Sequence, residues 1–288
     1  MTWFDESLYA EWSDQGYTQR LKISEIVYEI KSDHQRLIVF ETPCFGRVLA
    51  LDGVVQTTEK DEFAYHEMLT HVPLFAHGAV TDVLIIGGGA GGVLREVLRH
   101  SSVTSATMVE IDQGVVECCR EFLPGLSNGA FEDPRTNLII GDGCTFVAES
   151  ANQFDVILID STDPIGPGEV LFTEAFYRDC RARLNDGGIL VTQNGVPFTQ
   201  PEEFKASNER LGRVFEDVGF YLTVVPTYIG GFMALGWATD DLSHRNIEPE
   251  LLSDRVAAAG FTGRYYSPEI HNAAFCLPPF IRTLLDEA

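Results

Sequence analysis

A basic surface is what this sequence most clearly lacks. The 288 residues include 20 Lys and Arg against 43 Asp and Glu, which gives a formal net charge of −23 at pH 7. Nucleic-acid binding is therefore disfavoured, because contacts to phosphate need basic side chains. The excess of acidic residues can serve solubility, or its electrostatic field can attract cationic ligands. The composition alone does not distinguish between these two functions.

The sequence also lacks cysteine pairs with metal-ligand spacing and long apolar runs. Its six cysteines show neither Cys-x-x-Cys spacing nor a His-paired zinc pattern, so we expect reduced core residues and no metal. No apolar run approaches the roughly 18 residues of a membrane span. The first six residues, MTWFDE, carry acid where a signal peptide carries basic residues. We therefore expect a cytoplasmic protein with no membrane partner.

What is present suits a substantial folded core. Hydrophobic residues make up 45% of the chain and charged residues 22%, which is typical of globular proteins. A chain of this length forms one large domain or two unequal ones.

The first part of the chain has the pattern of a small antiparallel sheet. Short apolar runs at 21–23, 26–30, 37–40 and 47–51 are separated by turn-forming residues. From 61 to 77, apolar residues recur at helical spacing and predict one helix. We expect an N-terminal β-strand domain over 1–60, a linking helix over 61–78 and a catalytic domain over 79–288.

The pattern changes at Asp82, where compact apolar runs begin to alternate with helical segments. This alternation predicts an α/β fold with a doubly wound parallel sheet, because each crossover helix must cover a face of the sheet. The predicted strands are 83–86, 106–109, 137–140, 156–159 and 189–192, the predicted helices are 93–100, 114–122, 173–184 and 202–218, and the segments 221–226 and 232–239 can form a final hairpin.

A glycine-rich turn follows the first of these strands. The sequence GGGAGG at 87–92 lets the backbone turn tightly and approach a ligand closely, with Gly87 and Gly89 in the turn. Such a turn by itself can also be a strand-to-helix connection without a ligand. The carboxylate of Glu110 falls 23 positions after Gly87, near the end of the next strand. An acid at that offset can accept hydrogen bonds from both ribose hydroxyls, so the pair indicates an adenine nucleoside.

The third strand is followed by Gly141, Asp142 and Gly143. The short acidic side chain can accept a hydrogen bond from the exocyclic amino group of adenine, although Asp and Gly also suit a simple turn. A dinucleotide with its pyrophosphate and an S-adenosyl sulfonium both fit this layout. The acidic charge modestly favours the cationic sulfonium.

The fourth strand leads into a loop with two carboxylates. In the sequence FDVILIDSTDPIGPG at 154–168, Asp160 ends the apolar strand and Asp163 follows three positions later. Ligands of open α/β sheets bind beyond the carboxyl ends of the strands, where both acids must lie. Asp163 could alternatively cap a turn before Pro164. For Asp160, at the end of a buried strand, we favour a role in the site.

An ordered set of motifs identifies the chain as similar to bacterial spermidine synthases, which are polyamine aminopropyltransferases. The motifs extend over nearly the whole chain and are DHQ (33–35), FGRV (45–48), LDGVVQTTE (51–59), DEFAYHEM (61–68), the glycine loop, VEID (109–112), DSTDP (160–164) and PTY (226–228). The resemblance implies a β-rich N-terminal domain before a methyltransferase-like Rossmann domain, assembled as a homodimer.

The resemblance further implies transfer of the aminopropyl group of decarboxylated S-adenosylmethionine, a co-substrate, to putrescine. The products are spermidine and 5′-methylthioadenosine, and no prosthetic group or metal is involved. By the same resemblance, Asp160 is the proton acceptor, and the other roles divide between two sets of residues. The methylthioadenosine part is held by Gln35, Glu110, Asp142, Gly143 and Pro167 together with Gly87 and Gly89, and the amine is bound by Tyr65, His66, Ser161, Thr162, Asp163 and Tyr228.

The chain departs from the family pattern at Ala90. The fourth residue of the glycine loop is normally an Asp that helps to bind the amine end of the donor or product. A charge-assisted hydrogen bond contributes roughly 1.5–3 kcal/mol, so its loss weakens that contact by about one to two powers of ten. Three explanations are open. Other acidic residues bind the ammonium in place of this Asp, or the natural amine substrate differs in length from putrescine, or the tail of the donor is not a simple ammonium. We hypothesise that Asp163 and nearby waters compensate.

Three other functions share parts of this pattern. An S-adenosylmethionine-dependent methyltransferase explains Glu110 and Ala90 but leaves Asp160 and Asp163 without a cationic acceptor. A non-catalytic polyamine or nucleoside sensor explains Ala90 but not the retention of Asp160. A nicotinamide dehydrogenase ranks last, because no residue set suits hydride transfer. The acceptor among putrescine, cadaverine and longer amines stays open. His66 can equally be a packed polar residue beside the linking helix.

Overall fold

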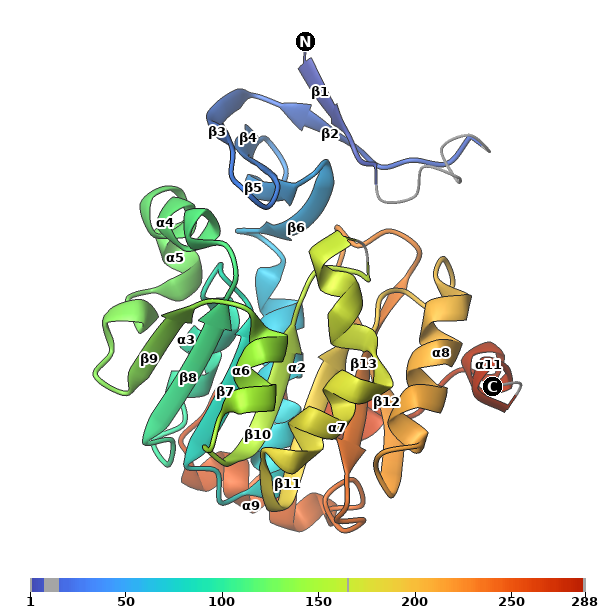
Figure 1. The fold of residues 1–288 in the computed structure, drawn as a ribbon. Helices are drawn as coiled ribbons and strands as arrows, with labels where there is room; N and C mark the ends of the chain where they lie inside the picture. Colours follow the sequence, from blue (N-terminus) through green and yellow to red (C-terminus); the bar gives the residue numbers. More distant parts are fainter. Residues whose placement is uncertain (1, 8–15, 165, 287–288) are drawn as a thin grey trace.

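The computed structural model describes residues 2–7, 16–164 and 166–286, which form two small antiparallel sheets and one large mixed sheet. The small sheets lie together at one end of the large sheet (Figure 1). The first pairs β1 (Thr2–Asp5) with β2 (Arg20–Ile23), and the second has the strand order β3 (Glu25–Lys31), β4 (Arg36–Thr42), β5 (Gly46–Leu51), β6 (Val54–Thr58).

The N-terminal sheet is apolar on both faces of its central strand. Along β4, Leu37 and Val39 pack in one cluster with residues of the following domain, whereas Ile38 and Phe40 pack in a second cluster with Leu21 of β2. Alternate residues of a strand point to opposite faces, so β4 joins the two small sheets to the rest of the molecule. The predicted antiparallel sheet is confirmed.

The linking helix is α2 (Glu62–His77), and it is buried on nearly every side. It packs against the large sheet, against α3 and against the C-terminal segment. The carboxylate of Glu67 accepts backbone hydrogen bonds from residues 264, 265 and 266, each at 2.8 Å. This helix therefore fixes the C-terminal segment to the sheet and presents its first turn to the N-terminal domain.

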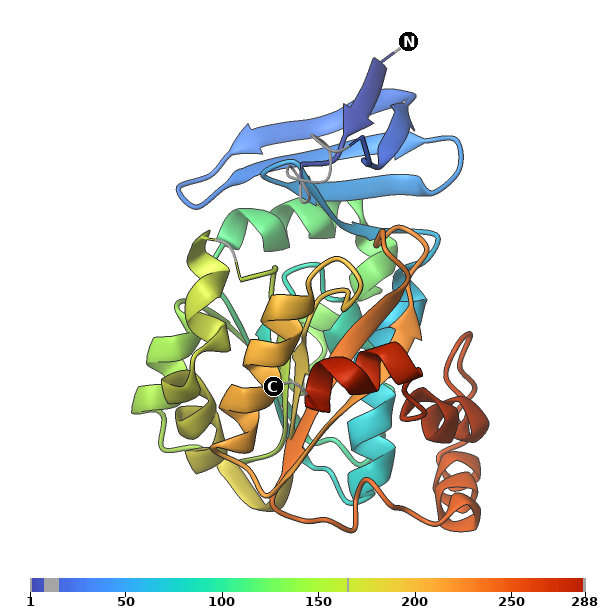
Figure 2. The same ribbon diagram turned by 90° about the vertical axis from the view of Figure 1, so that its right-hand side faces the viewer.

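The large sheet has the order β12-β13-β11-β10-β7-β8-β9, with β7 to β11 parallel and β13 and β12 antiparallel at one edge. Helices α6, α7 and α8 cover one face, and α2 and α3 cover the other (Figures 1 and 2). The predicted Rossmann-like α/β fold is confirmed. Its elements are β7 (Asp82–Gly87), α3 (Gly92–Leu98), β8 (Ser105–Glu110), α4 (Gln113–Phe122), α5 (Pro124–Ser127), η1 (Ala130–Glu132), β9 (Thr136–Ile140), α6 (Gly143–Glu149), β10 (Phe154–Asp160), η2 (Gly166–Phe172), α7 (Glu174–Ala182), β11 (Leu184–Gln193), α8 (Pro201–Gly212), β12 (Asp217–Val224) and β13 (Phe232–Thr239).

Several predicted bounds were wrong. The helix predicted over 202–218 ends at Gly212, and Asp217 already belongs to β12, where it is ion-paired with Arg245. Leu184, predicted to end a helix, begins β11 instead. The sequence pattern did not predict the three C-terminal helices, which are α9 (Pro249–Ala258), α10 (Pro268–Ala274) and α11 (Pro279–Asp286).

The cysteines only partly follow the prediction of core residues. Cys118, Cys119 and Cys180 are buried, but Cys44 and Cys276 are exposed. Within the described part of the chain, no helix is both long and apolar enough to cross a membrane.

Candidate active site

A cavity of about 260 Å³ lies between the N-terminal sheet and the carboxyl ends of β7, β8 and β10. Leu49 and Leu51 of β5 form part of its wall on the N-terminal side, and the glycine loop forms part of the opposite wall. The predicted site residues in its lining are Gln35, Tyr65, His66, Gly87, Gly89, Ala90, Glu110, Asp142, Gly143, Asp160, Ser161, Thr162, Asp163 and Tyr228. The side chain of Pro167, in η2, lies outside the described residues. The structure thus brings together every predicted site residue that it describes.

The glycine loop is pressed against the end of β10. Gly87 pairs with Asp160 in the parallel ladder, and the Gly88 N–H donates to the Asp160 carbonyl at 2.8 Å. Gly87 has a φ of +83°, and a Cβ there would lie 2.2 Å from that carbonyl oxygen. Only glycine permits this backbone approach, which places the loop directly beside the Asp160 side chain.

Glu110, at the end of β8, is a buried carboxylate beside the same loop. Its two oxygens accept backbone hydrogen bonds from Gly89 at 3.0 Å and from Asp112 at 2.9 Å. Burial raises the pKa of Glu110 to about 7, although the two N–H groups favour its ionised form. An acceptor fixed in this way suits neutral hydroxyl donors such as those of a ribose.

Asp112 joins the N-terminal hairpin to this end of the cavity, a contact that the sequence analysis did not predict. Its Oδ2 accepts hydrogen bonds from Ser32 at 2.7 Å and from Gln35 Nε2 at 3.0 Å, and its Oδ1 caps α4 by accepting from Gly114 N. The Gln35 amide nitrogen is therefore held by Asp112, which leaves the Gln35 oxygen for a ligand.

Asp142 both lines the cavity and caps a helix. Its Oδ1 accepts a hydrogen bond of 2.7 Å from the backbone N–H of Cys144 at the start of α6. At Gly143 a Cβ would lie 2.5 Å from Cγ2 of Ile86, so the backbone there packs directly on β7. The turn function that the sequence allowed for Asp142 is present, together with its position in the cavity.

Asp160 and Tyr65 form the polar pair at the other end of the cavity. The Tyr65 hydroxyl donates to Oδ1 of Asp160 at 2.8 Å. Burial raises the pKa of Asp160 above its ordinary value, and the nearby His66 and the hydrogen bond from Tyr65 oppose that rise. Across residues 2–7, 16–164 and 166–286, no Lys or Arg forms an ion pair with Asp160 or Asp163. Their negative charge is available to a cationic ligand.

Asp163 contacts amide side chains that the sequence analysis missed. Gln193 Nε2 lies 3.4 Å from its Oδ1, and the amide of Gln200 is also close to this carboxylate. Burial raises the pKa of Asp163 as well. The amides hold the carboxylate without neutralising it. The hydroxyl of Ser161 is buried and has no hydrogen-bond partner in the described structure.

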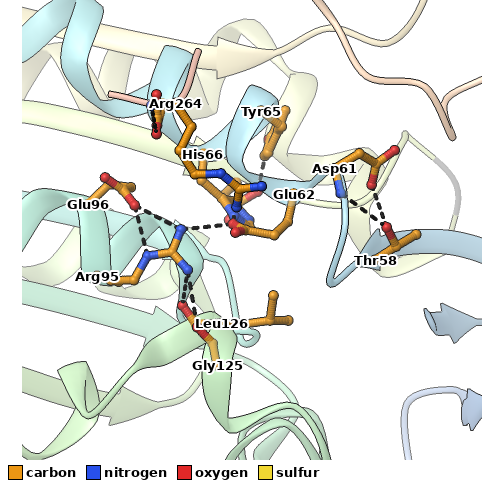
Figure 3. Close-up of polar contacts among 12 residues, drawn as sticks. Thr58, Asp61, Glu62, Tyr65, His66, Arg95, Glu96, Gly125, Leu126 and Arg264 are labelled. Atoms are coloured by element: carbon orange, nitrogen blue, oxygen red, sulfur yellow. Dashed lines mark hydrogen bonds and ion pairs between the residues drawn. The ribbon is translucent and has the colours of Figure 1, made fainter. Parts of the chain in front are cut away.

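Tyr228 is held over the cavity by Asp61, a second residue that the sequence analysis did not assign. The Tyr228 hydroxyl donates to the Gln56 carbonyl at 2.5 Å, and its ring meets the Tyr65 ring edge-on at 6.1 Å between centroids. Asp61 Oδ2 accepts from Thr227 N at 2.9 Å and from Thr227 Oγ1 at 2.7 Å. Figure 3 shows the other oxygen of Asp61 turned to Thr58, whose hydroxyl donates at 2.6 Å.

His66 is both packed and part of the cavity lining. Its Nδ1 lies 2.6 Å from Oε2 of Glu62, one turn earlier on α2. The imidazole also lies against Gly92, where a Cβ would come within 2.2 Å of the ring. The packed position that the sequence allowed for His66 is therefore present, and the residue also lines the cavity.

Ala90 occupies an apolar part of the wall. Its side chain packs against the cluster that contains Leu49, Leu51 and Val115. Alanine at this position supplies no charged or hydrogen-bonding side chain to the cavity.

Comparisons with known proteins agree along the whole chain. Residues 62–247 match the family model of the spermine/spermidine synthase domain, and residues 3–59 match that of the spermidine synthase tetramerisation domain. The polyamine aminopropyltransferase of Pseudomonas syringae pv. tomato is 52% identical over 288 residues, which cover 100% of this chain and 99% of that protein. Polyamine aminopropyltransferase 1 of Pseudomonas aeruginosa is 55% identical over 281 residues, which cover 98% of this chain and 96% of that protein.

Solved structures give the same result. A spermidine synthase in complex with the transition-state analogue AdoDATO superposes with a TM-score of 0.92 at 40% identity, covering 100% of this chain and 96% of that one. The spermidine synthase of Thermotoga maritima has a TM-score of 0.91 at 39% identity, covering 100% of this chain and 95% of that one.

Proposed function

The chain belongs to the spermine/spermidine synthase family, and from this premise we propose how it carries out aminopropyl transfer. The donor is decarboxylated S-adenosylmethionine, the acceptor is putrescine, and the products are spermidine and 5′-methylthioadenosine. The observation that supports this best is the position of Asp160, a partly buried carboxylate that forms no ion pair with a described Lys or Arg, next to the glycine loop and Glu110.

The acceptor amine must lose a proton before it can react. An alkyl amine has a pKa near that of lysine, about 10.4, so well under one molecule in a hundred is nucleophilic at neutral pH. Asp160 first attracts the ammonium and then accepts its proton as the nitrogen attacks the methylene carbon bonded to the sulfonium. The carbon–sulfur bond breaks, and its electron pair leaves with a neutral thioether. The rings of Tyr65 and Tyr228 exclude water from this step.

The remaining residues align the two substrates. Gln35, Glu110, Asp142, Gly143 and Pro167 hold the methylthioadenosine part, with the glycine loop beneath it. The distal ammonium of the diamine lies in the part of the cavity that contains Asp160 and Asp163. The side chains proposed for the amine are Tyr65, His66, Ser161, Thr162, Asp163 and Tyr228.

The molecule assembles as an oligomer through its N-terminal segment. The match of residues 3–59 to a tetramerisation domain supports an oligomer, and does not single out the homodimer expected from the sequence. The edge strand β3 leaves Ile26 and Ile30 exposed, and a second copy can cover them. We also place the protein in the cytoplasm.

Mass spectrometry of the products tests this function. The protein is incubated with either decarboxylated or intact S-adenosylmethionine and with putrescine, cadaverine or spermidine as acceptor. We expect 5′-methylthioadenosine and spermidine from the decarboxylated donor with putrescine. S-adenosylhomocysteine as the product would instead mean methyl transfer, and calorimetric binding without turnover would mean a sensor.

A further inference from the structure

A largely buried chain of polar side chains runs from the cavity into the large domain through His66, Glu62 and Arg95 (Figure 3). Glu62 and His66 are the first and fifth residues of α2, so their side chains lie on one face of the helix. Oε2 of Glu62 lies 2.6 Å from His66 Nδ1 and accepts a second hydrogen bond from Arg95 Nη2 at 2.8 Å. The Glu62 side chain is only 6% exposed, so neither contact is shared with bulk water.

The contact with Glu62 decides which nitrogen of His66 carries a proton. Burial alone would raise the pKa of Glu62, but the hydrogen bonds from His66 and Arg95 lower it below its ordinary value, so Glu62 is an anion that only accepts. His66 Nδ1 must therefore be the donor. Because the ring lines the cavity and Nδ1 is occupied, Nε2 is the nitrogen that remains for a ligand.

The ring is also fixed in place by its surroundings. Gly92, at the start of α3, lies so close that a Cβ there would be 2.2 to 2.7 Å from three ring atoms. Tyr65 lies on another side, with its ring centroid 5.6 Å from that of His66. The imidazole cannot turn away from Glu62 without moving one of these neighbours.

Arg95 is held just as firmly. Its Nη1 donates to the Leu126 carbonyl at 2.7 Å and its Nε donates to Oε1 of Glu96 at 2.8 Å. The second oxygen of Glu96 is occupied by Arg99 at 2.6 Å and by His71 at 2.9 Å. Arg95 thus balances the charge of Glu62 from a fixed position, so the carboxylate does not depend on a proton from His66 for its neutrality.

We propose that Glu62, with Arg95 beside it, is a positioning residue that holds the Nδ1–H form of His66 and so presents Nε2 as a hydrogen-bond acceptor to the substrate ammonium. This inference rests on the proposed function, because it takes a cationic amine as the ligand. Glu62 itself does not contact the substrate. It sets the orientation and the tautomer of His66, which does. The acceptor nitrogen of His66 matters particularly in this chain, because Ala90 supplies no carboxylate to the same cavity.

Steady-state kinetics of a double-mutant cycle test the proposal. Glu62→Ala should raise the KM for the amine about tenfold to a hundredfold, the size of one lost hydrogen bond to a charged group, with a smaller change in kcat. Glu62→Gln should recover part of this loss, because its amide oxygen still accepts from Nδ1. The double variant Glu62→Ala/His66→Ala should be no worse than His66→Ala alone, since Glu62 acts only through the imidazole. Additive losses would overturn the proposal.

A second measurement needs no substrate. In protein labelled with ¹⁵N-histidine, the His66 signals, assigned by comparison with His66→Ala, should report the Nδ1–H form in the native chain and a mixture of forms in Glu62→Ala. The same tautomer in both would overturn the proposal. If the native protein formed no aminopropyl product, the proposed function would fail while this measurement still decided the role of Glu62.

The control is Glu174→Gln. Glu174 is the first residue of α7, as Glu62 is of α2, and it is paired with Arg178 at 2.5 Å. It does not belong to the cavity lining. We expect no change in the amine KM for this variant, and melting temperatures of all variants separate a loss of fold from a loss of binding.

Discussion

The Tyr65 hydroxyl donates a hydrogen bond of 2.8 Å to Oδ1 of Asp160, although the two residues are 95 positions apart. Tyr65 lies in the first turn of α2 and Asp160 ends β10, so this bond joins the start of the linking helix to the carboxyl end of a central strand. It also stabilises the ionised carboxylate in an environment that disfavours charge. The pH at which Asp160 can act as a base therefore depends on Tyr65.

The first prediction concerns Tyr65→Phe. Burial raises the pKa of Asp160 and the Tyr65 hydrogen bond opposes that rise, so its removal should raise the pKa further. A hydrogen bond to a charged group contributes roughly 1.5–3 kcal/mol, which corresponds to a shift of about one to two pH units. Since the base form is lost as the pH falls, the acidic limb of kcat/KM should move by that amount to higher pH. Rates measured between pH 5 and 10 check this shift.

Tyr228→Phe is the matched control for that experiment. The Tyr228 hydroxyl donates to the Gln56 carbonyl and not to Asp160, so its loss should leave the position of the acidic limb unchanged. An equal shift in both variants would contradict a specific effect of the bond between Tyr65 and Asp160.

The second prediction separates catalysis from binding at Asp160. Asp160→Asn keeps nearly the same shape but removes the basic group, so turnover should fall by about two to four powers of ten. The affinity for 5′-methylthioadenosine, measured by calorimetry, should change far less. Equal losses of turnover and nucleoside affinity would instead mean that this carboxylate is structural.

The third prediction links the nucleoside site to stability. Burial raises the pKa of Glu110 from 4.5 to about 7. Between those pH values the folded protein holds a proton that the unfolded chain has lost, so this group lowers the free energy of unfolding as the pH rises. Glu110→Gln should remove a decrease of up to about 3 kcal/mol between pH 5 and 8, and it should also weaken nucleoside binding.

Urea denaturation at several pH values measures that effect. The matched control is Glu121→Gln, which changes an exposed glutamate on α4 and should leave the pH dependence of unfolding as it is in the native chain. A Glu110 variant whose unfolding free energy varies with pH as steeply as that of the native protein would refute the prediction.

The strands and the acids at their ends were predictable from sequence for one physical reason. A parallel strand with both faces covered reads as a continuous apolar run, so a carboxylate that ends such a run stands out. Asp160 was found in this way and Glu110 by its spacing from the glycine loop, and the structure places both beside that loop. The bounds of the helix after Pro201 were predicted less well: Asp217, assigned to that helix, lies in β12, and its partner Arg245 is 28 positions away in the sequence.

The polar residues that support the site could not be identified from local pattern. Asp61 holds Thr227, which is 166 positions away, and Asp112 holds Gln35 across 77 positions. Glu62 contacts its neighbour His66 on the same helix, but so would any glutamate at that spacing on an exposed helix. Only the burial of the pair, the contact of His66 with Gly92 and the approach of Arg95 distinguish it.

The fourth prediction concerns the departure at position 90. Ala90→Asp restores the carboxylate of the family pattern, so we expect the KM for decarboxylated S-adenosylmethionine to fall by up to about one to two powers of ten. The new side chain faces Leu49, Leu51 and Val115, so the variant should also be less stable without ligand than the native chain. Steady-state kinetics and thermal melts with and without donor measure the two effects.

Ala90→Asn separates charge from size at the same position. It should destabilise the protein to a similar or smaller extent without the gain in donor affinity, because an amide does not attract an ammonium as a carboxylate does. If instead Ala90→Asp raised the KM for the decarboxylated donor, the apolar cavity wall around Ala90 would be suited to a donor with a different tail. Intact S-adenosylmethionine would then be the substrate to test, since a carboxylate at position 90 would repel the carboxylate that this donor retains. If the native chain formed no product with either donor and any diamine or triamine, the hypothesis that Asp163 compensates for the carboxylate missing at position 90 would also be refuted.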